Sequence, residues 1–148
     1  MITLLKEYVF LAPYATAFGV VIAICQIWRN IEQSKTAFED SLSKEYREII
    51  RSITYNALIG EPIAEDEKEH EFNKIYNYMD FCNEQIFLRK NGRIRKNTWM
   101  DWQDGMKINF SLPIFGETSK KVFDKLPDIF HELRMVKDKN FDTDPNKW

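Results

Sequence analysis

The segment best suited to chemistry is a short basic stretch, Arg89–Lys96, which reads Arg-Lys-Asn-Gly-Arg-Ile-Arg-Lys. It carries five positive charges and no negative one, whereas the whole chain has a net charge of −2. Guanidinium groups donate flat, paired hydrogen bonds that match phosphate oxygens, and the tryptophans that follow can stack on nucleobases. These types and spacings predict a site for a phosphate-bearing ligand, with ligand-binding side chains at Arg89, Lys90, Arg93, Arg95, Lys96, Trp99 and Trp102.

Three interpretations of this basic segment stay open from the sequence alone. The segment binds the phosphates of a nucleotide, or it binds an anionic lipid headgroup near a membrane. In the third interpretation it is a solvated loop that balances the acidic run at residues 61–71, within one chain or across a subunit contact. A long nucleic acid is not an expected partner, because the chain is acidic overall, with a pI of about 5.8.

Signatures of catalysis are missing from the sequence. The two histidines, His70 and His131, do not fall at a spacing typical of metal ligands. There is no Gly-x-Ser-x-Gly motif, no glycine-rich phosphate loop and no Cys-x-x-Cys pair. We therefore predict a protein that is not an enzyme, with no catalytic residue, no metal site and no cofactor.

The element that must position any such site begins with an uncharged run from Tyr8 to Trp28. A helix rises about 1.5 Å per residue, so a run of this length crosses the roughly 30 Å hydrocarbon core of a bilayer. The aromatic residues at both ends suit the headgroup level of a membrane. The run predicts a transmembrane anchor within residues 1–29.

A cleaved signal peptide and a buried core helix are the two alternatives to a membrane anchor for this run. A cleaved signal peptide would use the small residues Ala15-Thr16-Ala17, but the preceding charges of Lys6 and Glu7 cancel and the apolar run continues beyond them. A buried core helix of a soluble bundle would show a polar stripe, and only Thr16 and Gln26 interrupt the run.

Flanking charges and small residues extend the membrane interpretation. Arg29 and Lys35 follow the run, so the positive-inside rule predicts a single-pass protein of the bacterial inner membrane with a cytoplasmic C-terminal domain. Ala15, Gly19 and Ala23 recur at every fourth position, a spacing that lets membrane helices approach closely. We expect the lipid bilayer and a second copy of the chain, in a homo-oligomer, as partners.

The remaining chain predicts an all-α fold: a small cytoplasmic helical domain over residues 30–138, with a long second helix, and a polar tail over residues 139–148 expected to be frayed. The second helix follows the first and is ended by Gly60-Glu61-Pro62. A third helix ends near Asn91-Gly92, and a fourth is capped by Asn97-Thr98 and ends before Pro113. A fifth starts at Thr118 or Ser119, carries Val136 near its end and is interrupted by Pro127.

Aromatic side chains make up 14% of the chain, a high share for a domain of this size. Each aromatic ring buries about 150–250 Å² of surface, so a few of them can fill a small core. The helical spacing assigns to the core Phe72, Tyr76, Phe81, Phe123 and Phe130.

The order of these features resembles two kinds of protein. The charge-free first helix, the segment Ile75–Phe81, Gly92-Arg-Ile, Trp99-Met-Asp-Trp102 and Phe115 are similar to a family of small bacterial membrane-anchored helical proteins of unassigned function. The layout also resembles the membrane effectors of type III CRISPR systems, in which a short membrane helix joins a cytoplasmic domain that oligomerises and binds a cyclic oligoadenylate. The chain lacks the Rossmann-like sensor pattern that many such receptors use.

The second resemblance implies a non-enzymatic membrane sensor in antiviral defence. The cytoplasmic domain would bind a cyclic nucleotide messenger, with one basic cluster contributed by each subunit, and would perturb the membrane through an oligomeric span. The alternative is a membrane-anchored scaffold or adaptor that holds a protein partner and binds no small ligand.

Overall fold

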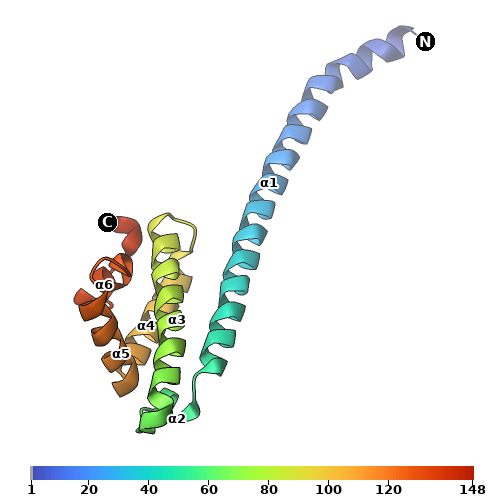
Figure 1. Cartoon of the computed structure of the whole chain (residues 1–148). Helices are drawn as coiled ribbons and strands as arrows, with labels where there is room; N and C mark the ends of the chain where they lie inside the picture. The colour runs from blue at the N-terminus through green and yellow to red at the C-terminus, as the bar shows by residue number, and fades with distance from the viewer. Residues whose placement is uncertain (1) are drawn as a thin grey trace. The chain divides into compact units, whose positions relative to one another are not determined.

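The computed structural model describes residues 2–148, with their side chains from Tyr14 onward, and these residues form helices and no strand. The predicted all-α class is confirmed. The elements, traced in Figure 1, are α1 (Ile2–Ser52), α2 (Tyr55–Ile59), α3 (Glu65–Lys90), α4 (Lys96–Ser111), α5 (Pro113–Lys125), α6 (His131–Asp138) and the 3-10 turn η1 (Pro145–Lys147). Contacts divide the chain into two compact units, residues 1–38 and 39–148.

In the first unit, α1 exposes its apolar side chains. Among the described residues, α1 is the one helix that is long and apolar enough to cross a membrane, and its apolar stretch is not buried. Trp28 is the most exposed of its large apolar side chains, at 71%, and Gly19 has no other heavy atom near its missing side chain. The predicted role of Tyr8 lies outside the described side chains.

The predicted second helix is the continuation of the first, because α1 runs unbroken to Ser52. It ends earlier than the expected stop near Gly60. The buried carboxylate of Glu71 accepts a hydrogen bond from the backbone N–H of Thr54 at 3.1 Å, where the chain leaves α1. A short α2 follows, and it ends at Gly60 in the left-handed conformation (φ 78°), as the glycine predicts.

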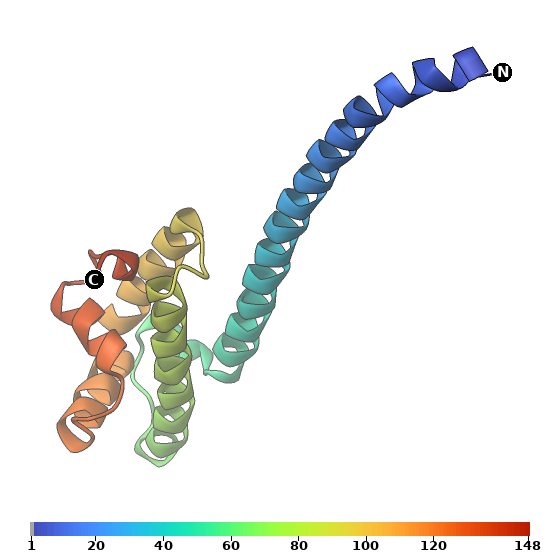
Figure 2. The same cartoon turned by 90° about the horizontal axis from the view of Figure 1, so that it is seen from above.

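The core of the second unit forms around α3, which contacts α4, α5, α6 and η1; Figure 2 shows these helices from a second side. The ring of Tyr78 on α3 lies against Phe110 and Phe115, with centroids 5.6 and 5.5 Å away. Of the aromatic side chains predicted for the core, Phe81 and Phe130 are buried, and Phe72 and Phe123 are half-buried.

Tyr76 departs from that prediction, because its side chain is 37% exposed. It lies on α3 and its ring meets that of Phe130 edge-on, with centroids 5.2 Å apart. The helical spacing placed it close to the core, but the position lies at the margin of the buried face.

The predicted start of the fifth helix is wrong. Proline occupies the first turn of α5, which begins at Pro113, where a missing N–H costs no hydrogen bond. Thr118 and Ser119 lie inside this helix and are buried, and their hydroxyls donate to the carbonyls of Ile114 and Gly116. The predicted interruption near Pro127 is confirmed, since α5 ends at Lys125 and α6 begins at His131.

The C-terminal segment, residues 140–148, also differs from the expectation of a frayed tail. Phe141 and Pro145 are buried, and η1 lies against α3. The sequence of this segment is polar, but its few apolar side chains and one carboxylate meet complementary groups on the helices.

Candidate functional site: the basic segment and its acidic partners

The basic segment forms the end of α3, a tight turn and the start of α4. The N–H of Gly92 donates to the carbonyl of Arg89, and the N–H of Arg93 donates to the carbonyl of Leu88, both at 3.0 Å. This is the Schellman pattern, which requires a left-handed residue, and Gly92 supplies it with φ 70°. The predicted helix end at Asn91-Gly92 is confirmed.

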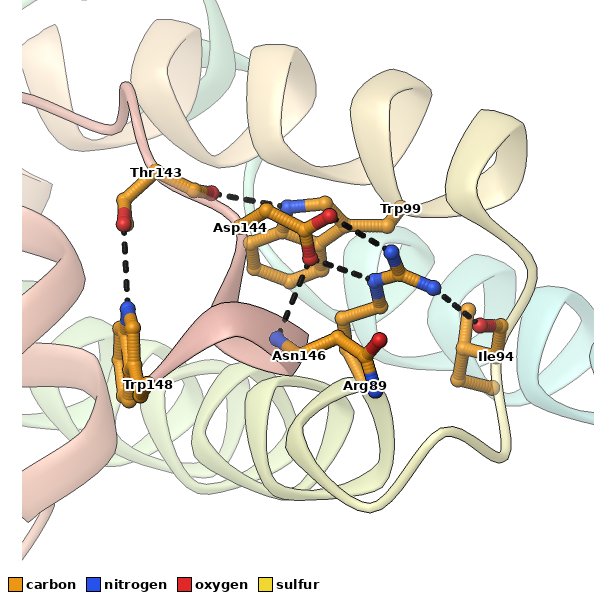
Figure 3. A network of polar contacts seen from close by, with 7 residues as sticks. All are labelled: Arg89, Ile94, Trp99, Thr143, Asp144, Asn146 and Trp148. Carbon is orange, nitrogen blue, oxygen red and sulfur yellow. Dashed lines mark hydrogen bonds and ion pairs between the residues drawn. The ribbon is translucent and has the colours of Figure 1, made fainter.

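Arg89 points into the domain, and each nitrogen of its guanidinium group donates a hydrogen bond. Its Nε and Nη2 donate to the two carboxylate oxygens of Asp144, each at 2.7 Å, and its Nη1 donates to the carbonyl of Ile94 at 2.8 Å (Figure 3). The residue is only 7% exposed. The bidentate geometry predicted for phosphate is thus present, with a carboxylate of the same chain in the place of the phosphate.

Arg95 lies at the start of α4 and meets the buried carboxylate of Glu39, from α1. The backbone N–H of Arg95 donates to Glu39 at 2.7 Å, its guanidinium lies 3.3 Å from the same carboxylate, and the Thr98 hydroxyl donates to it at 2.9 Å. A negative group at a helix N-terminus satisfies free N–H groups and favours the helix dipole. The cap of α4 therefore comes from Glu39, and the prediction of capping by Asn97-Thr98 is wrong.

The other three basic side chains lie nearer the surface. Lys90 is 3.6 Å from the Glu132 carboxylate, and its ammonium lies 6.0 Å from the centre of the Trp148 ring. Arg93 and Lys96 are exposed. Arg89, Lys90 and Arg95 therefore pair with three different carboxylates, from Asp144, Glu132 and Glu39.

The two tryptophans of the predicted site, Trp99 and Trp102, lie in different surroundings. Trp99 is 1% exposed and donates its indole N–H to the carbonyl of Thr143 at 3.0 Å. Trp102 is half-buried and lines a cavity of about 120 Å³ with Tyr46 and Tyr78, whereas Trp99 and Lys96 line a separate hollow of about 390 Å³. The predicted ligand-binding residues are thus not gathered in one cavity.

The larger hollow has a mixed charge. It is lined by α4 and the C-terminal segment, with lysines at Lys96 and Lys147 and carboxylates at Asp104, Asp142 and Asp144. The hydrogen bonds from Arg89 lower the pKa of Asp144, so this carboxylate stays charged near neutral pH. The hollow therefore offers positive and negative groups to a ligand, and its charge does not favour phosphate alone.

The buried thiol of the domain is not suited to chemistry. Burial raises the pKa of Cys82 to about 12, which keeps it protonated. Burial also raises the pKa of the neighbouring Tyr78. Within residues described by the structure, no group of three histidine, cysteine, aspartate or glutamate side chains could hold a metal ion.

The sequence analysis missed the acidic partners of the basic segment. Glu39 and Asp144 lie 56 and 55 residues away in the chain from the arginines that they bind. The one available signal was the pair of opposite charge runs, which indicated that the basic residues need counter-charges. It pointed to residues 61–71, whereas the structure supplies the counter-charges from α1, α6 and the C-terminal segment.

The arrangement is a set of basic side chains used to join helices and the C-terminal segment, beside a hollow with both signs of charge. In comparisons with known proteins, no protein-family profile, no curated protein and no solved structure matches the chain.

Proposed function

We propose that the protein is a membrane-anchored adaptor, in which the N-terminal half of α1 inserts into a bilayer and holds the helical unit at its surface. The observation that carries this proposal is the exposure of large apolar side chains from Tyr14 to Ile31, at 45–71%. Burying one such side chain contributes about 1.5–3 kcal/mol. A helix with this much apolar surface gains stability when lipid covers it.

The charges beside the apolar run support one orientation. Arg29 and Lys35 lie on its C-terminal side, and basic residues stay on the cytoplasmic side of bacterial inner membranes. The proposal therefore places the unit of residues 39–148 in the cytoplasm of a bacterial cell, with a single span.

The anchor is tested by fractionating cells that express the full chain and washing the membranes with alkaline carbonate. We expect the chain to stay in the membrane pellet. The double variant Val21→Arg/Ile24→Arg should move to the soluble fraction, since each arginine near the centre of a span costs about 2.5–3.5 kcal/mol. The matched control Lys44→Glu/Arg47→Glu, on the later part of α1, should remain in the pellet. Release of the wild-type chain by the wash would contradict the anchor.

The contacts of the basic segment within its own chain support an adaptor rather than a receptor for a small ligand. Arg89 and Arg95 are bound to Asp144 and Glu39, and Trp99 is buried. A phosphate ligand at these groups would have to displace partly buried ion pairs, which is costly because the carboxylate of Glu39 or Asp144 is left without its partner. A protein partner that binds elsewhere on the domain would leave these contacts intact.

Binding of a cyclic nucleotide messenger, such as a cyclic oligoadenylate, is the second candidate function. The 390 Å³ hollow favours it, because exposed Lys96 lines it beside Trp99. Thermal unfolding of the full chain in detergent micelles, with a panel of cyclic dinucleotides and cyclic oligoadenylates, tests this candidate. A ligand at 100 times its Kd stabilises the folded state by about 2.7 kcal/mol.

The variant that separates the two functions is Lys96→Glu, with Lys107→Glu, an exposed position later on α4, as its matched control. A stabilising shift that Lys96→Glu removes and Lys107→Glu keeps would establish the messenger site. Without a shift for any nucleotide, the adaptor remains and the messenger candidate is rejected.

A further inference from the structure

The C-terminal segment is bound by side chains of α3 and α4, and its residues 142–144 form the non-helical stretch between the turn after α6 and η1. The Gln103 amide donates to the carbonyl of Phe141, and the Trp99 indole donates to the carbonyl of Thr143, two residues further along. The next residue, Asp144, has extended backbone angles (φ −109°, ψ 106°) and pairs with Arg89. Three donors on two helices therefore recognise successive acceptors of one short segment.

Apolar and aromatic contacts complete this recognition. The Phe141 ring stacks on Phe110, with centroids 5.6 Å apart and planes inclined by 14°, and Pro145 is buried. At the chain end, the Trp148 ring lies below the ammonium groups of Lys90 and Lys139, at 6.0 and 5.2 Å. The Trp148 indole N–H also donates to the Thr143 hydroxyl (Figure 3). Anchors at both ends and a paired carboxylate between them are the features of a peptide ligand.

The segment is connected to the rest of the domain by a short hinge. α6 ends at Asp138, and Asn140 and Phe141 follow with φ 52° and 54°. Left-handed angles are common for asparagine but disfavoured for phenylalanine. A rearrangement of these two residues to extended angles would relieve this backbone conformation and carry the whole segment away from its own helices.

We propose that the surface formed by Gln103, Trp99 and Arg89 is a peptide-docking site that also accepts residues 141–148 of a second copy of the chain. In such a dimer, Asp144 of the partner subunit pairs with Arg89, and the exchange is reciprocal. Every contact made within one chain is made again between chains. The equilibrium between the monomer and the exchanged dimer therefore depends on the hinge and on the local concentration of copies.

This site is independent of the membrane anchor, since it uses only residues of the unit 39–148. Residues 141–148 already fit the site within one chain, and the same residues of a second copy fit it equally. A foreign peptide would need the same aromatic residue three positions before an aspartate, followed by proline, as in Phe141-Asp-Thr-Asp-Pro145.

Charge reversal tests the exchange with full-length chains in detergent micelles. One chain carries Arg89→Asp and the other carries Asp144→Arg. Alone, each places two like charges in its own site. In a mixture, a reciprocally exchanged heterodimer restores both ion pairs, because the aspartate at position 89 meets the partner's arginine and the intact Arg89 meets the partner's Asp144. We expect heterodimer recovery through a tag on one chain to rise about tenfold over the control mixture.

The control mixture combines tagged and untagged copies of Arg89→Asp alone, in which position 89 faces an aspartate both within one chain and after exchange. It measures any association through α1, which is the same in all variants. Equal heterodimer recovery in the two mixtures would overturn the exchange. If either single variant fails to fold, recovery of its circular dichroism on mixing supports the exchange, and no recovery on mixing overturns it.

Discussion

The two units of this chain treat the same kinds of side chain in opposite ways. From Tyr14 to Ile31, the large apolar side chains are exposed, whereas in residues 39–148 Ile75, Met79 and Ile86 are fully buried. The polar groups differ as well: the second unit buries Glu39 and Glu71 and gives each carboxylate several donors. Apolar surface needs a cover: the second unit supplies its own, and in our proposal lipid covers the first.

The sharpest test of this difference removes one large apolar side chain from each unit. Phe115→Ala, at a fully buried ring, should lower the free energy of unfolding by about 3–5 kcal/mol, since it removes apolar contacts and leaves a cavity. Ile24→Ala, at an exposed position of α1, should leave the unfolding of the domain unchanged. Urea unfolding of the full chain in micelles, followed by circular dichroism, measures both. Equal losses would mean that residues 14–31 belong to the folded core.

A smaller loss of stability should follow from removing the Glu71 carboxylate, which binds the backbone where the chain leaves α1. Glu71 is 1% exposed and accepts from the Thr54 backbone N–H and from the Lys74 ammonium. Glu71→Ala should lower the free energy of unfolding by about 2–3 kcal/mol, because both donors lose a charged partner. The nearby exposed position in Glu69→Ala is the matched control and should change little. A variant as stable as the control would show that the turn does not depend on this carboxylate.

The carboxylate that caps α4 should contribute less. Glu39→Ala should reduce stability by about 1–2 kcal/mol, the usual cost of a lost helix cap. Its exposed neighbour gives the control Asp40→Ala, with an expected change near zero. The same urea titration applies, and amide hydrogen exchange in the first turn of α4 should speed up in Glu39→Ala alone. Unchanged exchange there would separate Glu39 from the cap.

The smallest change in stability should come from acid, which protonates Asp144. Arg89 lowers the pKa of Asp144 in the folded state, so the stabilisation is complete above the unfolded pKa of about 3.9 and is lost as pH falls through the folded value. In Asp144→Asn, stability should be lower at neutral pH, and the difference from wild type should shrink below about pH 4. Thermal unfolding between neutral and acidic pH measures it. A difference that is constant with pH would assign the loss to packing.

Sequence reasoning succeeded where the signal is local. The helix end at Asn91-Gly92 depends on one residue that tolerates a left-handed φ, and the interruption near Pro127 depends on a missing N–H and a steric clash. The long apolar helix follows from an uninterrupted run of side chains. Each of these properties belongs to a few neighbouring residues, and the chain adopts them largely without regard to the rest of the fold.

The misplaced helix starts have a different cause. Thr118, Ser119 and Thr98 are good capping residues by type, but their hydroxyls bond to other groups within the folded domain. Instead, Pro113 begins α5 through its fixed φ, and the carboxylate of Glu39 in α1 caps α4 through contact across the fold. Propensity identifies candidates for a cap, and tertiary contact selects among them.

By itself, the sequence determined that this chain is helical, where two of its helices stop and which stretch is apolar enough to enter a bilayer. Only the tertiary structure decided what the basic segment does, because a charge finds its partner through space. Arg89 and Arg95 meet Asp144 and Glu39 across more than fifty residues of chain. Ion pairs at such separation have no periodicity and no fixed spacing in the sequence, so only folding brings the two charges together.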